Sequence, residues 1–177
     1  VPTNGSDPSY ITPELQAKYD SFDCATDGAK VNSTDDPTKP VITCDDALAN
    51  KYILGPVEVD GSDITNATAG IVTSSSGVTT GEWAVNVTFN ATGTKAFSAV
   101  STRLYAIATA NASDPRGRFA FVIDGKVLEA PSMNGVITDG KPQITGSFTQ
   151  TSAQTLANQL KFGALPVSFK VQSQDTI

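Results

Sequence analysis

The side chains of this chain that could do chemistry are its carboxylates and its two cysteines, because the sequence contains no histidine. Without histidine there is no Ser-His-Asp triad, and two cysteines are too few for a zinc site built from several Cys and His ligands. Short acidic groups could bind Ca²⁺ through oxygen atoms; they lie at Asp35-Asp36, Asp45-Asp46 and Asp60-Gly61-Ser62-Asp63. None has the calcium-loop pattern that ends in a bidentate Glu. We therefore expect turn hydrogen bonds for these carboxylates, and we expect no metal and no cofactor.

The two cysteines, Cys24 and Cys44, enclose a loop rich in Asp, Thr, Gly and Pro that has no apolar core of its own. A disulfide would hold this loop in place and would contribute about 3 kcal/mol on the loop-entropy model. Two independent buried thiols, or a metal pair with distant carboxylates, are the alternatives. The disulfide is favoured, and it predicts an oxidising, extracytoplasmic setting.

Other polar motifs are weaker guides to function. Arg116 and Arg118 could contact a carboxylate, although a solvated turn is the simpler interpretation. Several N-x-[ST] sequons would carry glycans in a eukaryotic secreted protein, but a chain this rich in Asn, Ser and Thr produces some by chance. They begin at Asn4, Asn32, Asn66, Asn86, Asn90 and Asn111.

The charges exclude some classes of partner. The net charge is −6 over 177 residues, and neither half of the chain has the clustered Lys and Arg that a nucleic acid needs. No apolar run approaches the ~20 residues that cross a bilayer. We therefore expect no nucleic-acid partner, and any targeting signal or membrane-spanning helix to lie outside this sequence.

The chain is expected to divide into an irregular, Asp- and Pro-rich segment over residues 1–50, which carries the cysteine pair, and a folded domain over residues 51–177. In the second part, alternating and apolar runs predict strands at Tyr52–Val59, Trp83–Phe89, Phe119–Ile123, Val127–Leu128, Gln143–Phe148 and Val167–Val171. Helical spacing predicts helices over Ala91–Thr109, capped by Asn90, and from the Thr149 cap to Gly163. This order predicts an α+β fold: a ferredoxin-like split βαβ sheet with both helices on one face.

The C-terminal half of the chain contains a series of distinctive positions: Asp124-Gly125 with Pro131, Gln143 with Gly146, Leu160, and the run Gly163-Ala164-Leu165-Pro166. In these positions it resembles the periplasmic region of SecD, the accessory subunit of the bacterial Sec protein-export channel. The likeness extends more weakly to Leu54–Val57 and Trp83–Leu104, and covers about two-thirds of the chain. The Asp- and Pro-rich segment lies outside the general pattern and resembles the insertion seen in Gram-positive relatives.

This resemblance implies a domain on the extracytoplasmic face of the cell membrane that binds unfolded exported polypeptide and is not itself an enzyme. The partners it implies are SecF and the SecYEG channel, in a proton-motive-force-dependent cycle whose membrane helices lie outside this sequence. Exposed grooves or sheet edges would serve such binding without catalytic groups. Two rival hypotheses are a secreted or cell-surface adhesin and a small Ca²⁺-stabilised hydrolase with paired carboxylates.

A domain that moves relative to the membrane part also needs hinge residues. Gly163 and Pro166, which bound a short segment after the second predicted helix, are one hinge hypothesis, and a linker over Thr65–Gly70 is another. An ordinary helix C-cap and an ordinary loop explain the same residues equally well, so both interpretations stay open.

Overall fold

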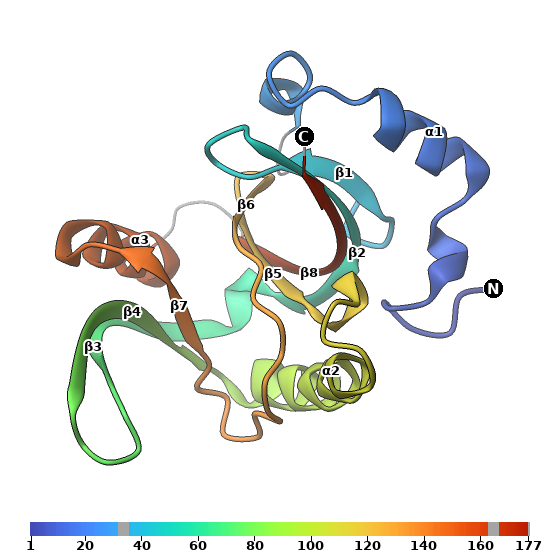
Figure 1. Ribbon diagram of the computed structural model, residues 1–177. Helices are drawn as coiled ribbons and strands as arrows, with labels where there is room; N and C mark the ends of the chain where they lie inside the picture. Colours follow the sequence, from blue (N-terminus) through green and yellow to red (C-terminus); the bar gives the residue numbers. More distant parts are fainter. Residues whose placement is uncertain (32–35, 163–166, 177) are drawn as a thin grey trace.

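The computed structural model describes residues 1–31, 36–162 and 167–176 of the chain. Over these residues the protein is a mixed α+β fold with three α-helices and eight strands. The strands form two antiparallel sheets, and in Figure 1 the smaller sheet and its helix stand out to one side of the larger sheet. None of the helices in this described part is long and apolar enough to cross a membrane.

The larger sheet curls until its two edge strands touch. Its order is β1-β2-β8-β5-β6, with bounds Val41–Cys44, Asn50–Asp60, Val167–Thr176, Phe119–Ile123 and Lys126–Glu129. Asp45, just after β1, bridges Val127 in β6, and the Thr43 hydroxyl donates a hydrogen bond to the Gly125 carbonyl. The strands therefore form the ring seen in Figure 1, and an apolar cluster is buried with it: Tyr52, Leu54, Ala120, Val122, Val127 and Ala130.

The smaller sheet has the order β3-β4-β7, with bounds Ile64–Thr73, Thr79–Phe89 and Gln143–Phe148. Helix α3 (Gln150–Phe162) lies against β3 and β4, because its apolar residues recur at helical spacing and face the strands. The residues that α3 buries in the main core are Ala153, Leu156, Ala157 and Leu160. We call β3, β4, β7 and α3 together the lobe.

A row of phenylalanine rings joins the lobe to the larger sheet. Phe97, in helix α2 (Ala91–Ala110), has its ring centroid 5.5 Å from that of Phe89 in β4 and 5.0 Å from that of Phe119 in β5. Phe119 is in turn 5.3 Å from Phe121. Edge and tilted contacts at these separations are favourable for aromatic rings. The main core therefore runs continuously from β4 through α2 to β5.

The start of α2 is fixed by Asn90, as the sequence predicts. Its side-chain oxygen accepts a hydrogen bond from the Gly93 amide at 2.8 Å, and its side-chain nitrogen donates to the Asp63 carboxylate at 3.0 Å. We expect Asn90→Ala to lower the free energy of unfolding by about 1 kcal/mol, the usual cost of losing an N-cap. Urea denaturation measures this loss, and the exposed Asn158→Ala in α3 is the control, expected within about 0.5 kcal/mol of the parent. A loss no larger than the control's would contradict the capping role.

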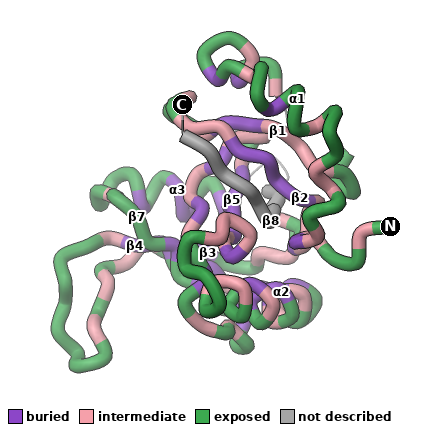
Figure 2. The backbone as a smooth tube through the Cα atoms, turned by 45° about the vertical axis from the view of Figure 1, so that its right-hand side comes forward, coloured by how far each residue is buried: buried purple, intermediate pink, exposed green. Residues whose placement is uncertain are grey.

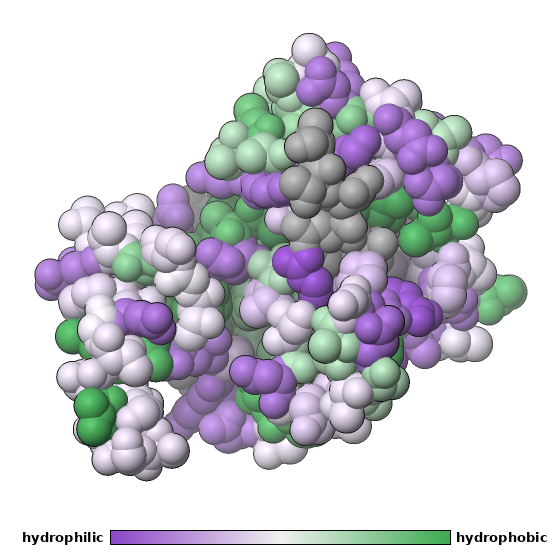
Figure 3. Space-filling view, viewed as in Figure 1, coloured by the Kyte–Doolittle hydropathy of each residue, from purple (hydrophilic) through white to green (hydrophobic). Residues whose placement is uncertain are grey.

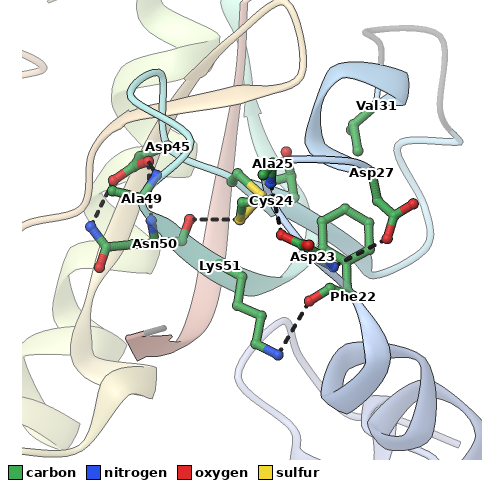
Figure 4. The surroundings of a disulfide bond; sticks show 12 residues. Phe22, Asp23, Cys24, Ala25, Asp27, Val31, Asp45, Ala49, Asn50 and Lys51 are labelled. Carbon is green, nitrogen blue, oxygen red and sulfur yellow. Dashed lines mark hydrogen bonds between the residues drawn. A yellow bond between two sulfur atoms is a disulfide. The ribbon is translucent and has the colours of Figure 1, made fainter.

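The N-terminal segment is fastened to the larger sheet by a disulfide and a lysine. Cys24 and Cys44 are bonded and wholly buried, which confirms the predicted bridge. At the end of helix α1 (Pro13–Ser21), the Lys51 ammonium donates to the Tyr19 carbonyl at 2.7 Å and lies 4.6 Å from the centroid of the Tyr19 ring. It also reaches the Phe22 carbonyl, as Figure 4 shows beside the disulfide. A cation at this end of a helix satisfies free carbonyls and complements the helix dipole.

Two structural expectations need correction. Residues 1–50 are not simply irregular, because they contain α1 and β1, and β1 completes the larger sheet. The α+β class is confirmed, but the strands divide between two sheets, and the expected ferredoxin-like single sheet is not confirmed. The reason is β3, a strand that the sequence pattern did not predict: it pairs with β4 along its length and draws β4 and β7 into a separate sheet. Helices α2 and α3 consequently pack on different sheets, with α2 against β2 and α3 against β3.

Candidate functional site

The feature best suited to hold another polypeptide is the outer edge of β3. This ten-residue strand pairs on one side with β4, and no other strand in the described part of the chain pairs with it. In an antiparallel strand the backbone groups of alternate residues point to opposite sides. Alternate N–H and C=O groups of β3 therefore point outward, where they can bond an added strand.

The sequence of β3 lacks the devices that usually protect such an edge. From Ile64 to Gly81, which spans β3, the turn and the start of β4, there is no charged residue and no proline. Natural sheets commonly block their edges with Lys, with Pro or by covering them. In the larger sheet the two edge strands, β1 and β6, cover each other where Asp45 bridges Val127. In the described part of the chain the edge of β3 is therefore unprotected; the outer edge of β7, at the other side of the same small sheet, also has no strand partner, charge or proline, but β7 is only six residues long.

The two faces of the lobe differ. On one face α3 packs over Ala67, Val85 and Val87, which are buried in the main core. The opposite face is polar: Thr68 and Asn86 are register partners and both are exposed, and the Gln143 side chain donates to the Asn86 side-chain oxygen at 2.8 Å. The helix therefore stiffens the sheet from behind, while the edge and the polar face remain accessible.

The hairpin that joins β3 to β4 extends beyond the body of the protein. Gly77 has a positive φ of 80°, and its amide donates to the Ser74 carbonyl at 2.9 Å to close the turn. Figure 2 shows this hairpin as an almost continuously exposed arm, and Ile71 and Val78 near its tip are exposed large apolar side chains. The arm thus lengthens the strand edge beyond the part that α3 covers.

Apart from the β3 edge, a hollow of about 510 Å³ between α1 and β1 is another candidate binding site. Its apolar lining includes Phe22 and Ile42, but charges of both signs stand on its rim, including Lys18, Asp27 and Asp36. An apolar groove of this kind could also receive a peptide. Because of its charged rim, the affinity of this hollow for a peptide would depend on the charge of the peptide, whereas the edge of β3 carries no charge.

The lobe meets the larger sheet at Glu129, the last residue of β6. Its carboxylate lies so close to Gly146 of β7 that a Cβ atom at position 146 would collide with it. Burial raises the pKa of Glu129, although the Arg118 guanidinium opposes this. Burial also raises the pKa of the Tyr52 hydroxyl and lowers that of Arg118, whose Nε donates to the Ala130 carbonyl at 2.7 Å. This junction is therefore a partly buried, titratable contact between the sheets.

The raised pKa of Glu129 gives a pH prediction with a definite sign. The folded protein holds this proton to a higher pH than the unfolded chain, so Glu129 lowers stability as pH rises above the ordinary glutamate value of about 4.3. We expect Glu129→Gln to be more stable than the parent at neutral pH, and the difference to disappear near pH 4 and below. Thermal melts from pH 4 to 8 measure it, with the exposed Asp46→Asn as control. A pH-independent difference would contradict the assignment.

The structure places the sequence-predicted residues apart from the β3 edge. Asp124 and Gly125, both with positive φ, form the β5–β6 turn, and the Pro131 carbonyl accepts a bond from the Phe119 amide. Gln143 and Gly146 lie in β7, at the opposite side of the small sheet from the β3 edge, and Leu160 is in the core. Gly163, Ala164, Leu165 and Pro166 lie outside the described residues.

Thr65–Gly70 is neither the linker of the hinge hypothesis nor the ordinary loop of its alternative, because these residues lie inside β3, which pairs with β4. The sequence pattern does not indicate this strand because its central apolar residues, Ala67 and Ala69, are small, and Ala67 alone is fully buried. The signal that could have found it is the cluster Ser74–Gly77 between two runs rich in Thr and Val, which is typical of a hairpin turn.

The acidic groups considered as calcium sites make local bonds in turns where the structure describes them. The Asp45 carboxylate accepts from the Ala49 amide and from the Asn50 side chain, and Asp60 accepts from the Ser62 amide. No cluster of three or more His, Cys, Asp or Glu suited to a metal occurs in the described residues. Arg116 contacts a carboxylate, that of Asp114 at 2.7 Å within the same turn, which lowers the pKa of Asp114. Arg118 is not in a solvated turn, because it is partly buried and donates to the Ala130 carbonyl.

Comparison with known proteins gives consistent matches. Residues 39–167 match the family model described as the SecDF P1 head subdomain. The protein translocase subunit SecD of Streptomyces coelicolor is 34% identical over 171 residues, which cover 94% of this chain and 28% of that protein. That of Acetobacter pasteurianus is 43% identical over 121 residues, which cover 68% of this chain and 20% of that protein. The chain thus spans less than a third of either relative.

Among solved structures, a crystal structure of SecDF in its super-membrane-facing form is 31% identical, with a TM-score of 0.47 over 68% of this chain and 14% of that one. A second structure, of SecDF as a membrane component that enhances protein export, is also 31% identical, with the same TM-score over 70% of this chain and 49% of that one.

Proposed function

Because the chain belongs to the SecDF family through its P1 head subdomain, we propose that it is an extracytoplasmic binding domain of a protein-export subunit. In this proposal the domain holds segments of an unfolded, exported polypeptide against the outer edge of β3. The polypeptide adds to the smaller sheet as a fourth strand, beside β3 and opposite β7.

The observation that carries this proposal is the open edge of β3, which has neither charge nor proline from Ile64 to Gly81. An exported chain presents many different sequences, so its binding site has to rely on features that every sequence shares. Strand addition does this, because main-chain hydrogen bonds supply the affinity and the side chains of the client alternate away from the contact. Helix α3 supports the sheet from behind, so the edge is held ready before the client arrives.

We extend this proposal to the whole protein, of which the present domain is one part. Membrane helices outside this sequence would hold the domain at the extracytoplasmic face of the cell membrane. SecF and the SecYEG channel would be its partners, and a cycle driven by the proton-motive force would move the domain. The segment Gly163–Pro166 stays the proposed hinge of that movement, and the chain itself would carry out no catalysis.

The test uses the isolated domain and a labelled, unfolded peptide with alternating apolar residues, followed by fluorescence anisotropy. A matched peptide of the same sequence carries N-methyl groups on consecutive backbone nitrogens in its central part, which removes donors from both of its edges. We expect micromolar binding of the first peptide and at least tenfold weaker binding of the second. Equal binding of both peptides would show that backbone pairing is not the mode of recognition.

Proline variants locate the binding on β3. Thr68 and Ala69 are neighbours in a regular stretch of the β3–β4 register, so one of their amides points to β4 and the other points outward. Thr68→Pro and Ala69→Pro therefore form a matched pair: one breaks the ladder and lowers the melting temperature, and the other removes an outward donor with little change in stability. We expect the stable variant of the two to lose peptide binding. Full binding by that variant would exclude this edge.

A further inference from the structure

The lobe is almost free of charge. The segments 64–94 and 142–160, which form β3, β4, β7, the start of α2 and most of α3, contain Glu82 as their single charged residue, and Lys161 in the last turn of α3 is the other charged residue of the lobe. The other 29 of the 30 charged residues lie in the remainder of the chain. Figure 3, in the orientation of Figure 1, shows the lobe mainly in pale colours of intermediate hydropathy, while strongly hydrophilic residues gather over the rest of the visible face.

We infer that the β3 edge does not select its client by charge, and that it accepts acidic, neutral and basic extended segments alike provided that they contain no proline. This inference rests on the proposed function and names the class of ligand for the same site. The ligand is a stretch of extended polypeptide recognised through its backbone, because proline alone among the residues lacks the N–H donor that strand pairing needs.

The physical reason is the short range of electrostatic forces in salt solution. At physiological ionic strength a charge is screened over about 8 Å. The side chains next to the edge are those of β3 itself, which are Thr, Asn, Ala, Gly, Ile and Val, and none of them carries a charge. A client docked along Thr65 to Ile71 would therefore meet hydroxyl, amide and methyl groups, with no fixed charge on the strand that it pairs with.

The hollow between α1 and β1, unlike the β3 edge, would bind peptides in a way that depends on their charge. Lys39 lies 3.8 Å from Asp36 on its rim, and Lys18 and Asp27 also line it. A peptide bound there would meet charges of both signs, so its affinity would depend on its own charge and on salt. Sensitivity to charge therefore separates the two places experimentally.

The experiment measures the binding of three peptides by fluorescence anisotropy, at low and at high salt. The peptides have the same length and the same alternating apolar residues, and their outward positions are all Glu, all Gln or all Lys. We expect dissociation constants within about threefold of one another and little change with salt. The matched variants Thr68→Lys and Thr68→Glu should each create a preference of about two- to fivefold, of opposite sign, for the peptide of opposite charge.

The outcomes separate the inference from the function on which it rests. If the parent binds the Lys peptide at least tenfold more tightly, and salt abolishes the difference, then the net charge of −6 governs binding and the inference is overturned while peptide binding stands. If none of the three peptides binds, the proposed function itself fails. If the parent binds the three peptides with equal affinity and neither Thr68 variant prefers the peptide of opposite charge, then the binding site lies away from β3. In that case the inference about the β3 edge is overturned.

Discussion

Replacing Phe97 with alanine is expected to lower the free energy of unfolding by about 3 to 5 kcal/mol, the usual cost of removing a buried phenylalanine side chain. Phe97 is 1% exposed and its ring contacts those of Phe89 and Phe119. The cavity would open where β4, α2 and β5 meet, so the transfer of apolar surface and the lost ring contacts both contribute. Chemical denaturation followed by tryptophan fluorescence measures the loss, because Trp83 lies in the lobe.

A control from the same helix keeps this prediction specific. Tyr105 is 39% exposed on α2, and Tyr105→Ala should change the free energy of unfolding by less than about 0.5 kcal/mol. The Phe97 variant should also let the lobe open separately from the larger sheet, which hydrogen exchange in β3 would report. A loss for Phe97→Ala of less than about 1 kcal/mol would show that the rings do not join the two sheets energetically.

Removing the disulfide, as Cys24→Ser with Cys44→Ser, is expected to cost about 3 kcal/mol, because the bridge closes a loop with a sequence separation of 20. For a chain of this size that loss lowers the melting temperature by roughly 6 to 12 °C. The unbridged protein would still contain β1, but β1 would be held only by its pairing with β2 and by its contacts with β6. Differential scanning calorimetry measures the change.

The burial of the disulfide supplies the control. Both sulfur atoms are wholly buried, so a reductant should act slowly on the native parent and quickly once urea unfolds it. The melting temperature of the reduced parent should then match that of the double variant. A double variant that melts with the oxidised parent would contradict the stabilising role, and would place the anchoring of the N-terminal segment in Lys51 and its carbonyl partners instead.

The sequence predicts those elements whose local signals agree with their packing. Helix α2 has a capping Asn90 and a buried stripe that includes Phe97 and Leu104 at helical spacing, so its position follows from the pattern. The Asp124-Gly125 pair, which separates two predicted strands, adopts positive φ at both residues, as a type I′ hairpin turn requires. In both cases the local sequence signal agrees with the backbone conformation that the structure shows.

The sequence is less informative where packing decides the structure. Strand β3 has little apolar alternation, because α3 covers it only in part and its side chains there are small. Helix α1 has a weak apolar face and buries Tyr19 alone, so the Thr12 cap before Pro13 was the main signal available. Strand β1 has only four residues, and its place depends on a distant disulfide partner. Missing β3 also hid the division into two sheets.

The candidate binding site, like the fold, could be predicted only in part from the sequence. The resemblance to SecD rests on turn, core and cap positions such as Gly125 and Leu160, which describe the scaffold. The proposed binding edge consists of backbone groups, whose availability depends on which strands pair. The pattern of side chains does not show which backbone groups lack a partner, whereas the strand order shows that β3 lies at the edge of its sheet.

The measurement that tests the central claim most directly is hydrogen exchange at single-residue resolution, with and without a neutral, proline-free extended peptide. Strand addition predicts new protection at alternate amides from Asn66 to Ile71, because only the outward N–H groups gain a partner. Amides of β1 and β6 should not change. Protection confined to the hollow between Leu15 and Ile42, or uniform protection without alternation in β3, would contradict the account.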